Sequence, residues 1–176
     1  MKRLPVTAFF VLAVFMSAAV RGQESSGPPP EMKVLHRLVG TWQVEHINKV
    51  AKWTPKETRL TSTSKKQLIL GGRFVRAEGG FDSEGKPANM ELYTYDSNRK
   101  TYLSWYFDAQ GNIGEFTATW DENSQTLTFR PKPGSPLTGV MTYHFLDERT
   151  FEWSIIAKDA SGEVGFHMEG KAVRQK

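Results

Sequence analysis

Hydrophobic and polar residues alternate in short runs along most of the chain, and residues typical of turns separate the runs. The runs are rich in Thr, Tyr, Phe, Trp and Val, which suit a pleated sheet surface. The turn signals recur about every 8 to 12 residues, the spacing of a β-sandwich or a β-barrel. The pattern predicts strands at 41–49, 58–70, 73–81, 88–95, 101–107, 113–120, 126–130, 138–146, 151–157 and 164–173.

Connections as short as these join antiparallel neighbours, because a parallel pair needs a crossover of a dozen or more residues. Closing such a meander into a barrel leaves no exposed strand edge. The sequence therefore predicts an all-β fold, an antiparallel up-and-down β-barrel of about ten strands. A two-sheet sandwich remains the alternative, since turn spacing does not distinguish the two architectures.

The residues before the first strand follow a different period. Pro30 suits the first turn of a helix, and Met32, Leu35 and Leu38 recur at helical spacing until Gly40 ends the pattern. We expect a short helix that packs its apolar side over one end of the barrel. Residues 23–30 are mostly Ser, Gly and Pro and predict a flexible linker.

The first residues have the organisation of a secretory signal peptide. Lys2 and Arg3 precede an apolar stretch at 4–16 and small residues at 17–19. The stretch is shorter than the roughly 20 residues that a membrane-spanning helix needs. We predict a signal peptide at 1–22, a barrel domain at 31–176, export to the periplasm or the medium, and no membrane span after cleavage. An uncleaved anchor is the alternative.

Charge and cysteine content restrict the possible partners. The net charge of +4 includes three basic residues of the leader, and the rest of the chain has 20 basic and 19 acidic side chains. Nucleic-acid binding needs a clustered basic face, so we expect no nucleic-acid partner. The pair Lys65-Lys66 is interpreted as a solvated patch. The chain has no cysteine, which excludes disulfides, thiolate metal sites and a cysteine nucleophile.

Three short motifs, Gly40-Thr41-Trp42, Leu70-Gly71-Gly72-Arg73-Phe74 and Tyr95-Asp96, resemble those of a bacterial family of exported lipocalin-like domains with unassigned function. More distantly, the chain is similar to the calycins, which include lipocalins, fatty-acid-binding proteins and nitrobindins. The resemblance covers 31–174 and implies a lipocalin-like barrel. It also implies that Trp42 packs at the closed end against a basic side chain of the last strand, either Arg174 or Lys171.

The resemblance to nitrobindins makes His167 a haem-ligand candidate, because that group holds haem through a histidine near the C-terminus. The Gly-rich and Tyr-Pro segment of that group is missing here, so we expect no cofactor. A metal site formed by His144, His167 and Glu169 is conceivable, since imidazole and carboxylate suit zinc. No recognised spacing motif supports it, and no metal is expected.

Polar residues on the predicted strands are candidates for ligand binding if their face points into the barrel. Alternation sorts residues into two faces but does not say which face points inwards, so water-exposed positions are the alternative for each. An arginine could hold a carboxylate through two parallel hydrogen bonds. The candidate ligand-binding residues are Arg73, Arg76, Tyr93, Tyr106, Glu115, His144 and His167.

We predict that this exported barrel, a monomer or a homodimer, binds a small apolar or amphipathic ligand inside. The numerous aromatic residues could line a pocket or simply fill a core. One alternative is an acid–base enzyme that uses His144 or His167 with Glu115 and an arginine. Another is a filled barrel that binds a partner through its loops or the Lys65-Lys66 edge. No nucleophile-elbow, zinc-protease or nucleotide-binding motif occurs, and no catalytic residue is assigned.

Overall fold

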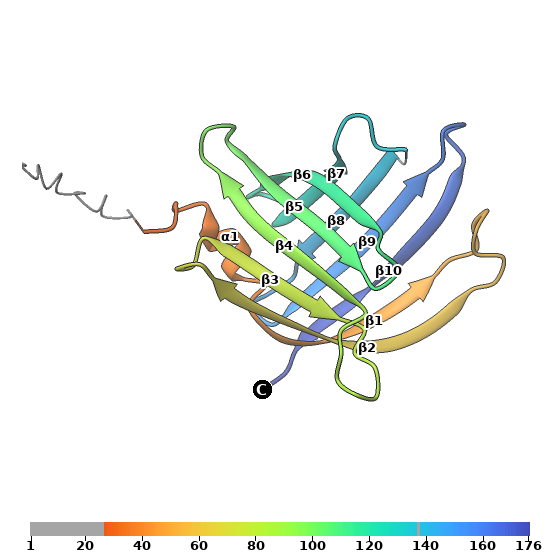
Figure 1. Cartoon of the computed structure of the whole chain (residues 1–176), viewed down its shortest axis with the longest axis horizontal. Coiled ribbons are helices and arrows are strands. Elements are labelled where there is room, and N and C mark those ends of the chain that lie inside the picture. The colour runs from red at the N-terminus through yellow and green to blue at the C-terminus, as the bar shows by residue number, and fades with distance from the viewer. Residues whose placement is uncertain (1–26, 137) are drawn as a thin grey trace, which may run out of the picture.

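The computed structural model describes residues 27–136 and 138–176. It is a closed antiparallel barrel of ten strands with one short helix near its N-terminal end (Figure 1). The predicted signal peptide at 1–22 lies outside the described residues, as does the first half of the predicted linker, residues 23–26. In the described ranges, no helix has the length and apolar character needed to cross a bilayer.

The barrel consists of strands that follow one another in chain order around its wall. They are β1 (Gly40–Asn48), β2 (Thr58–Ile69), β3 (Phe74–Gly79), β4 (Asn89–Asp96), β5 (Thr101–Asp108), β6 (Ile113–Asp121), β7 (Thr126–Pro131), β8 (Thr138–Phe145), β9 (Thr150–Lys158) and β10 (Val164–Arg174). Each pairs with its sequence neighbours in antiparallel register. The predicted meander is confirmed.

The first and last strands close the barrel. β1 pairs with β10 from Trp42 opposite Arg174 to Asn48 opposite Met168, and its other edge pairs with β2. Because each of the ten described strands has two neighbours, none of them has an open edge. The sandwich alternative is therefore excluded.

The corner between β2 and β3 shows why the chain turns where it does. Leu70, Gly71 and Gly72 have φ angles of 50°, 66° and 81°, a region that glycine enters without steric penalty. The Gly72 amide donates a hydrogen bond to the Ile69 carbonyl at 3.1 Å. The Gly-Gly pair therefore forms the corner between the strands predicted at 58–70 and 73–81.

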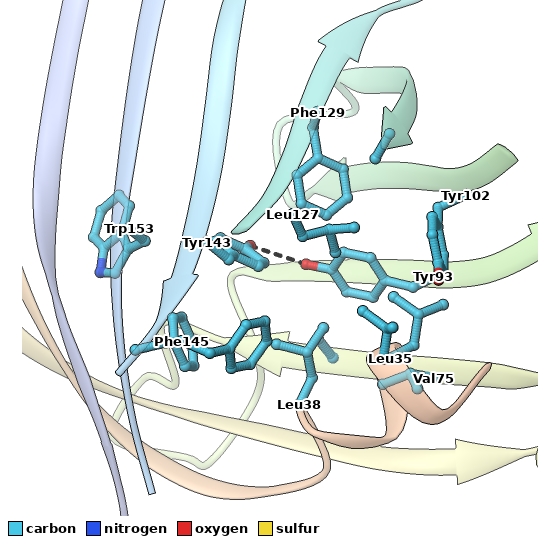
Figure 2. Packing of buried hydrophobic residues seen from close by; sticks show 14 of the residues in the cluster. Leu35, Leu38, Val75, Tyr93, Tyr102, Leu127, Phe129, Tyr143, Phe145 and Trp153 are labelled. Carbon is cyan, nitrogen blue, oxygen red and sulfur yellow. Dashed lines mark hydrogen bonds between the residues drawn. The ribbon is translucent and has the colours of Figure 1, made fainter. Parts of the chain in front are cut away.

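The helix α1 (Met32–His36) lies at one end of the barrel, opposite the β1–β2 and β9–β10 loops (Figure 1). Met32, Leu35 and Leu38 are fully buried, and Figure 2 shows Leu35 and Leu38 beside Val75 and Tyr93. The helical spacing of the apolar residues therefore predicted correctly that this segment packs over one end of the barrel. The α-helix itself is shorter than the stretch with helical spacing.

Trp42 and Arg174 pack together at this closed end. The Trp42 indole donates to the Leu38 carbonyl at 2.7 Å, and the Arg174 guanidinium carbon lies 4.8 Å from the centre of the indole ring. Arg174 also donates to the Arg37 carbonyl at 2.7 Å. The expected contact between Trp42 and a basic residue of the last strand is present, and it links α1, β1 and β10.

Aromatic side chains fill the half of the barrel next to α1. Phe129 makes edge-to-face contacts with Tyr93 and Tyr143, at ring-centre distances of 5.9 and 5.2 Å, and Trp42 makes one with Phe151 at 4.8 Å. Such pairs contribute about 0.5 to 1.5 kcal/mol beyond burial of their area. The core therefore occupies the closed half, and any internal space lies towards the opposite end.

Candidate functional site

The interior of the barrel holds a cavity of about 410 Å³ in the half away from α1. Successive residues of a strand point to opposite faces, and on every strand except β7 residues of one of the two alternating sets line this space. Most of the lining side chains are aromatic or aliphatic; they include Val44, Phe116, Met141, Ile155, Phe166 and Met168. Ligand pockets for small molecules have about this size and character.

Lys66 lies at the floor of the cavity. Its side chain is almost completely buried, and its Nζ lies 5.2 Å from the centre of the Tyr143 ring and 5.1 Å from that of Phe151. An ammonium over aromatic ring faces gains a cation–π attraction. Burial nevertheless disfavours the charged form and lowers the pKa of Lys66 to about 8, although the negative charge of Glu91 acts in the opposite direction.

Glu91 reaches the same floor from the other side of β3. Lys66 on β2 is paired with Ala77 on β3, and Ala77 is paired with Glu91 on β4. The two charged side chains are thus separated in the sheet only by the small side chain of Ala77. Both line the cavity, so its floor carries one positive and one negative group.

Two buried tyrosines connect Glu91 to the core. The Tyr93 hydroxyl donates a hydrogen bond to Glu91 Oε2, and the Tyr93 and Tyr143 hydroxyl oxygens are 3.1 Å apart. Figure 2 shows these two side chains pointing towards one another from β4 and β8. Burial raises the pKa of both phenols well above the usual value, so both remain neutral hydrogen-bonding groups.

Ser104 adds an unused polar atom to this floor. Its side chain is 1% exposed and lines the cavity, yet its Oγ has no hydrogen-bond partner among the described residues. A buried polar group left without a partner costs about 1 to 3 kcal/mol. A ligand with a polar group at this end would remove that cost.

Polar side chains also surround the upper part of the cavity. The imidazole of His46 lies 2.7 Å from Ser62 Oγ and makes an edge-to-face contact with Trp153 at 5.1 Å. Burial lowers the pKa of His46 below its ordinary value of 6.5, so the ring is mainly neutral at pH 7. The cavity wall at this level therefore provides uncharged hydrogen-bonding groups.

Of the candidate residues that the sequence analysis selected, Tyr93 and Tyr106 lie on the inner side. Tyr106 lines the cavity, and Tyr93 lies beneath it as part of the floor network. Arg73 lies at the corner before β3 and is not among the cavity-lining residues. Its carbonyl accepts a hydrogen bond from Thr94 Oγ1 at 2.7 Å.

The other four candidates lie on the outer face, because each has the parity opposite to the cavity-lining residues of its strand. Each is near an oppositely charged or chargeable side chain there. The pairs are Arg76 with Glu78 at 3.5 Å, Glu115 with Lys132 at 2.6 Å, His144 with Glu152 at 3.9 Å and His167 with Glu169 at 3.7 Å. A binding role inside the barrel is therefore not open to these residues, and the acid–base set that combined them does not converge in the interior.

His144, Glu152 and Glu169 border a second hollow, of about 450 Å³, on the outer surface of β8, β9, β10 and β1. In the described ranges, no cluster of three or more His, Cys, Asp or Glu residues is arranged to hold a metal ion. His167 points away from the cavity, so it is not placed to ligate a haem inside the barrel.

Lys66, Glu91 and Ser104 were not among the candidate residues predicted from the sequence. Lys66 was interpreted as part of a solvated patch with Lys65, and this interpretation is wrong. Adjacent strand residues point to opposite faces, so Lys65 is exposed above Phe81, at 4.8 Å from its ring centre, while Lys66 points inwards. For Glu91 a signal was available, because it shares a strand face with the aromatic residues Tyr93 and Tyr95.

The geometry defines a class of protein: a closed ten-stranded antiparallel barrel with an internal cavity that has a polar floor. A family model described as "Protein of unknown function (DUF1579)" matches residues 27–174, and the chain belongs to this family. No curated protein shows a significant sequence match to the chain.

Solved structures with a similar fold come from distant sequences. Rv2717c from M. tuberculosis is 14% identical with a TM-score of 0.60, over 85% of this chain and 99% of that one. A DUF3598-family protein of unknown function from Nostoc punctiforme PCC 73102 is 12% identical with a TM-score of 0.58, over 80% and 48%. The S-type phycobiliprotein lyase CPES from Guillardia theta is 13% identical with a TM-score of 0.53, over 82% and 92%.

Proposed function

We propose that this protein binds a small, mostly apolar ligand inside its barrel, in the manner of the calycins. The observation that carries the proposal is the cavity of about 410 Å³ with predominantly aromatic and aliphatic walls. Pockets of about 300 to 1,000 Å³ with apolar walls and a few polar groups are typical of small-molecule sites. The similar fold of a phycobiliprotein lyase supports the view that a barrel of this form can serve a chemical function.

The polar groups of the cavity favour an amphipathic ligand over a pure hydrocarbon. Lys66 and Glu91 lie on either side of Ala77 at the floor, and Ser104 also lines the cavity. The walls nearer the opening are formed by Ile155, Phe166 and Met168. A ligand with one polar end and an apolar body would match both regions. The filled-barrel alternative receives no support from a cavity of this volume.

A bulky residue on the cavity wall tests this proposal. Ser64 on β2 lines the cavity, and the next residue, Thr63, is exposed on the outer face. We expect Ser64→Trp to weaken binding of decanol at least about tenfold, or about 1.4 kcal/mol, because the indole occupies the ligand's space. Isothermal calorimetry measures the affinity, and native mass spectrometry of protein from its own host reports any resident molecule.

Thr63→Trp is the matched control, because it introduces the same side chain on the same strand outside the barrel. It should bind decanol like the wild type. Equal affinities of the wild type and Ser64→Trp would contradict internal binding, and so would the absence of both a resident molecule and any uptake from a panel of apolar compounds.

We further propose that the protein is exported, on the basis of the charged, apolar and small-residue segments at 1–22. Expression of the full chain in a bacterium should yield a product that lacks these residues and is found in the periplasm or the medium. The intact mass of the purified protein checks this result. A product that retains 1–22 and remains in the membrane fraction would instead support an uncleaved anchor.

A further inference from the structure

Lys66 is the feature of the cavity that simple ligand packing leaves unexplained. Lysine is almost never fully buried unless it is paired, yet among the described residues no ion pair joins Lys66 to a carboxylate. Its immediate neighbours are the rings of Tyr143 and Phe151. Glu91 acts on it only through space. A lysine is thus one of the residues that line an apolar cavity, with its nitrogen beside two aromatic rings that line the same cavity.

We propose that Lys66 forms a reversible imine with an aldehyde or ketone group at the end of an apolar chain that fills the cavity. The inference rests on the proposed function, because it names the polar end of the ligand. The geometry that supports it is a buried amine at the closed end of the cavity, one nearby carboxylate and one unpartnered hydroxyl.

The reaction needs no reagent beyond the carbonyl compound. The neutral Lys66 nitrogen attacks the carbonyl carbon and forms a C–N bond, while a proton moves from nitrogen to the carbonyl oxygen. The resulting carbinolamine loses its hydroxyl group and the remaining N–H proton together as water, so that the C–O bond breaks and a C=N double bond forms. Addition of water to the imine reverses the sequence. A lysine desolvated in a hydrophobic pocket is activated for this type of attack.

The other floor residues suit the intermediates. Ser104 Oγ has no other hydrogen-bond partner among the described residues and can donate to the oxygen of the carbonyl or the carbinolamine. Glu91, held by Tyr93, can act as the counter-ion of a protonated imine. The protonated imine would stay beside the rings of Tyr143 and Phe151, where the ammonium lies in the free protein.

Charge balance favours a carbonyl over a carboxylate as the polar end. The floor already holds Lys66 and Glu91, one charge of each sign. A ligand carboxylate would place a second negative charge near Glu91, and like charges in a weakly solvated site repel strongly. Conversion of an ammonium into a protonated imine leaves the net charge of the floor unchanged.

Reductive trapping with decanal tests the inference. The folded protein is incubated at pH 7 with decanal and sodium cyanoborohydride, which converts the imine into a stable secondary amine, and decylated residues are located by peptide mass mapping. We expect Lys66 to be modified at least about tenfold faster than Lys65, because the cavity would hold decanal beside Lys66. The lowering of the pKa of Lys66 from 10.5 to about 8 also makes its own neutral amine roughly 300-fold more abundant at this pH.

Lys66→Met should abolish trapping in the cavity, and Lys65→Met is the matched control that should retain it. The melting temperature of each variant verifies that it is folded. Equal modification of Lys65 and Lys66, or unchanged trapping in Lys66→Met, would overturn the inference. A third result would also overturn the inference: decanoate binds strongly to the wild type but not to Lys66→Met, and decanal is not trapped on Lys66. Lys66 would then bind an anion and would not form an imine.

Decanol separates this inference from the proposed function, because it has the same chain without a carbonyl group. If decanol binds and decanal is not trapped on Lys66, the imine is wrong and internal binding remains. If neither compound binds, both proposals fail. Protection of Lys66 from decanal by decanol, in proportion to its occupancy, supports both.

Discussion

Replacement of Lys66 by methionine is expected to raise the free energy of unfolding by about 2 to 3 kcal/mol at pH 7. Burial lowers the pKa of Lys66 to about 8 from 10.5, which corresponds to about 3 kcal/mol at 1.36 kcal/mol for each pH unit. The attraction to the rings of Tyr143 and Phe151 is lost in the variant and offsets part of this gain. Methionine is similar in length and fills the space without a charge.

The pH dependence of this effect identifies its cause. Below pH 8, Lys66 carries its proton in both the folded and the unfolded chain, and the folded state bears the full cost of the buried charge. Between pH 8 and 10.5 the unfolded chain binds more protons than the folded one, so the wild type becomes more stable as the pH rises. The advantage of Lys66→Met should therefore shrink over this interval.

Urea unfolding of both proteins at pH 7, 8, 9 and 10 measures the difference. Tyr93 and Tyr143 also have shifted pKa values, but they are present in both proteins and largely cancel. Lys65→Met, a change on the outer face, should alter stability by less than about 0.5 kcal/mol. A Lys66→Met protein that is less stable than the wild type, or a difference independent of pH, would contradict the assignment of a costly buried charge.

The stability cost also supports a chemical role for Lys66. Residues that act in binding or catalysis are often placed where they destabilise the folded state. If Lys66→Met is more stable than the wild type but no longer forms the decanal adduct, then Lys66 lowers the stability of the folded state and provides the reactive amine. The stability measurement and the trapping experiment are independent, because the first needs no ligand.

Gly170→Ala is expected to lower the free energy of unfolding by about 3 kcal/mol. A Cβ atom at position 170 would lie 1.8 Å from the Glu45 carbonyl oxygen and 2.9 Å from the Trp153 indole nitrogen. The Glu45 oxygen belongs to the backbone of β1, so the clash cannot be relieved by rotating a side chain. The two strands that close the barrel, β1 and β10, would have to move apart (Figure 1).

Urea unfolding measures the loss, and hydrogen exchange locates it: protection should fall first for the amides that pair β1 with β10. Gly27→Ala makes the same chemical change where no atom lies within 4 Å, and its stability should remain within about 0.5 kcal/mol of the wild type. If Gly170→Ala also stayed within that range, the close approach of the two backbones would not be a requirement of closure.

Strands and turns could be predicted because they depend on local sequence. Alternating residues suit a pleated strand with two different faces, and Gly71 and Gly72 take backbone angles that other residues rarely adopt. Trp42 and Arg174 were matched through a resemblance, and their contact at 4.8 Å follows from the register that pairs them. Ser62, Ser64 and Lys66 could not be assigned to a face, because the alternating set on the same strand is equally polar.

The strand β9 shows the opposite case. Phe151 and Trp153 point inwards and Glu152 points outwards, so hydrophobicity alone distinguishes its two faces. On β8, His144 and Tyr143 are both able to bind a polar ligand, and only Tyr143 lines the cavity. The candidate site was therefore least predictable where a polar interior replaced the usual apolar one.

By itself, the sequence determined the strand count, the antiparallel order and the short helix, because each depends on periods and turns that act over a few residues. The pairing of β1 with β10 decided that the meander closes into a barrel and not a sandwich. The tertiary structure alone decided which face of each strand is enclosed. As a result, Lys65 lies on the outer surface and the adjacent Lys66 lines the cavity. The physical reason is that strand alternation is symmetric between the two faces. The two faces become different when β1 pairs with β10, because closure then encloses one face of every strand and leaves the other exposed to water.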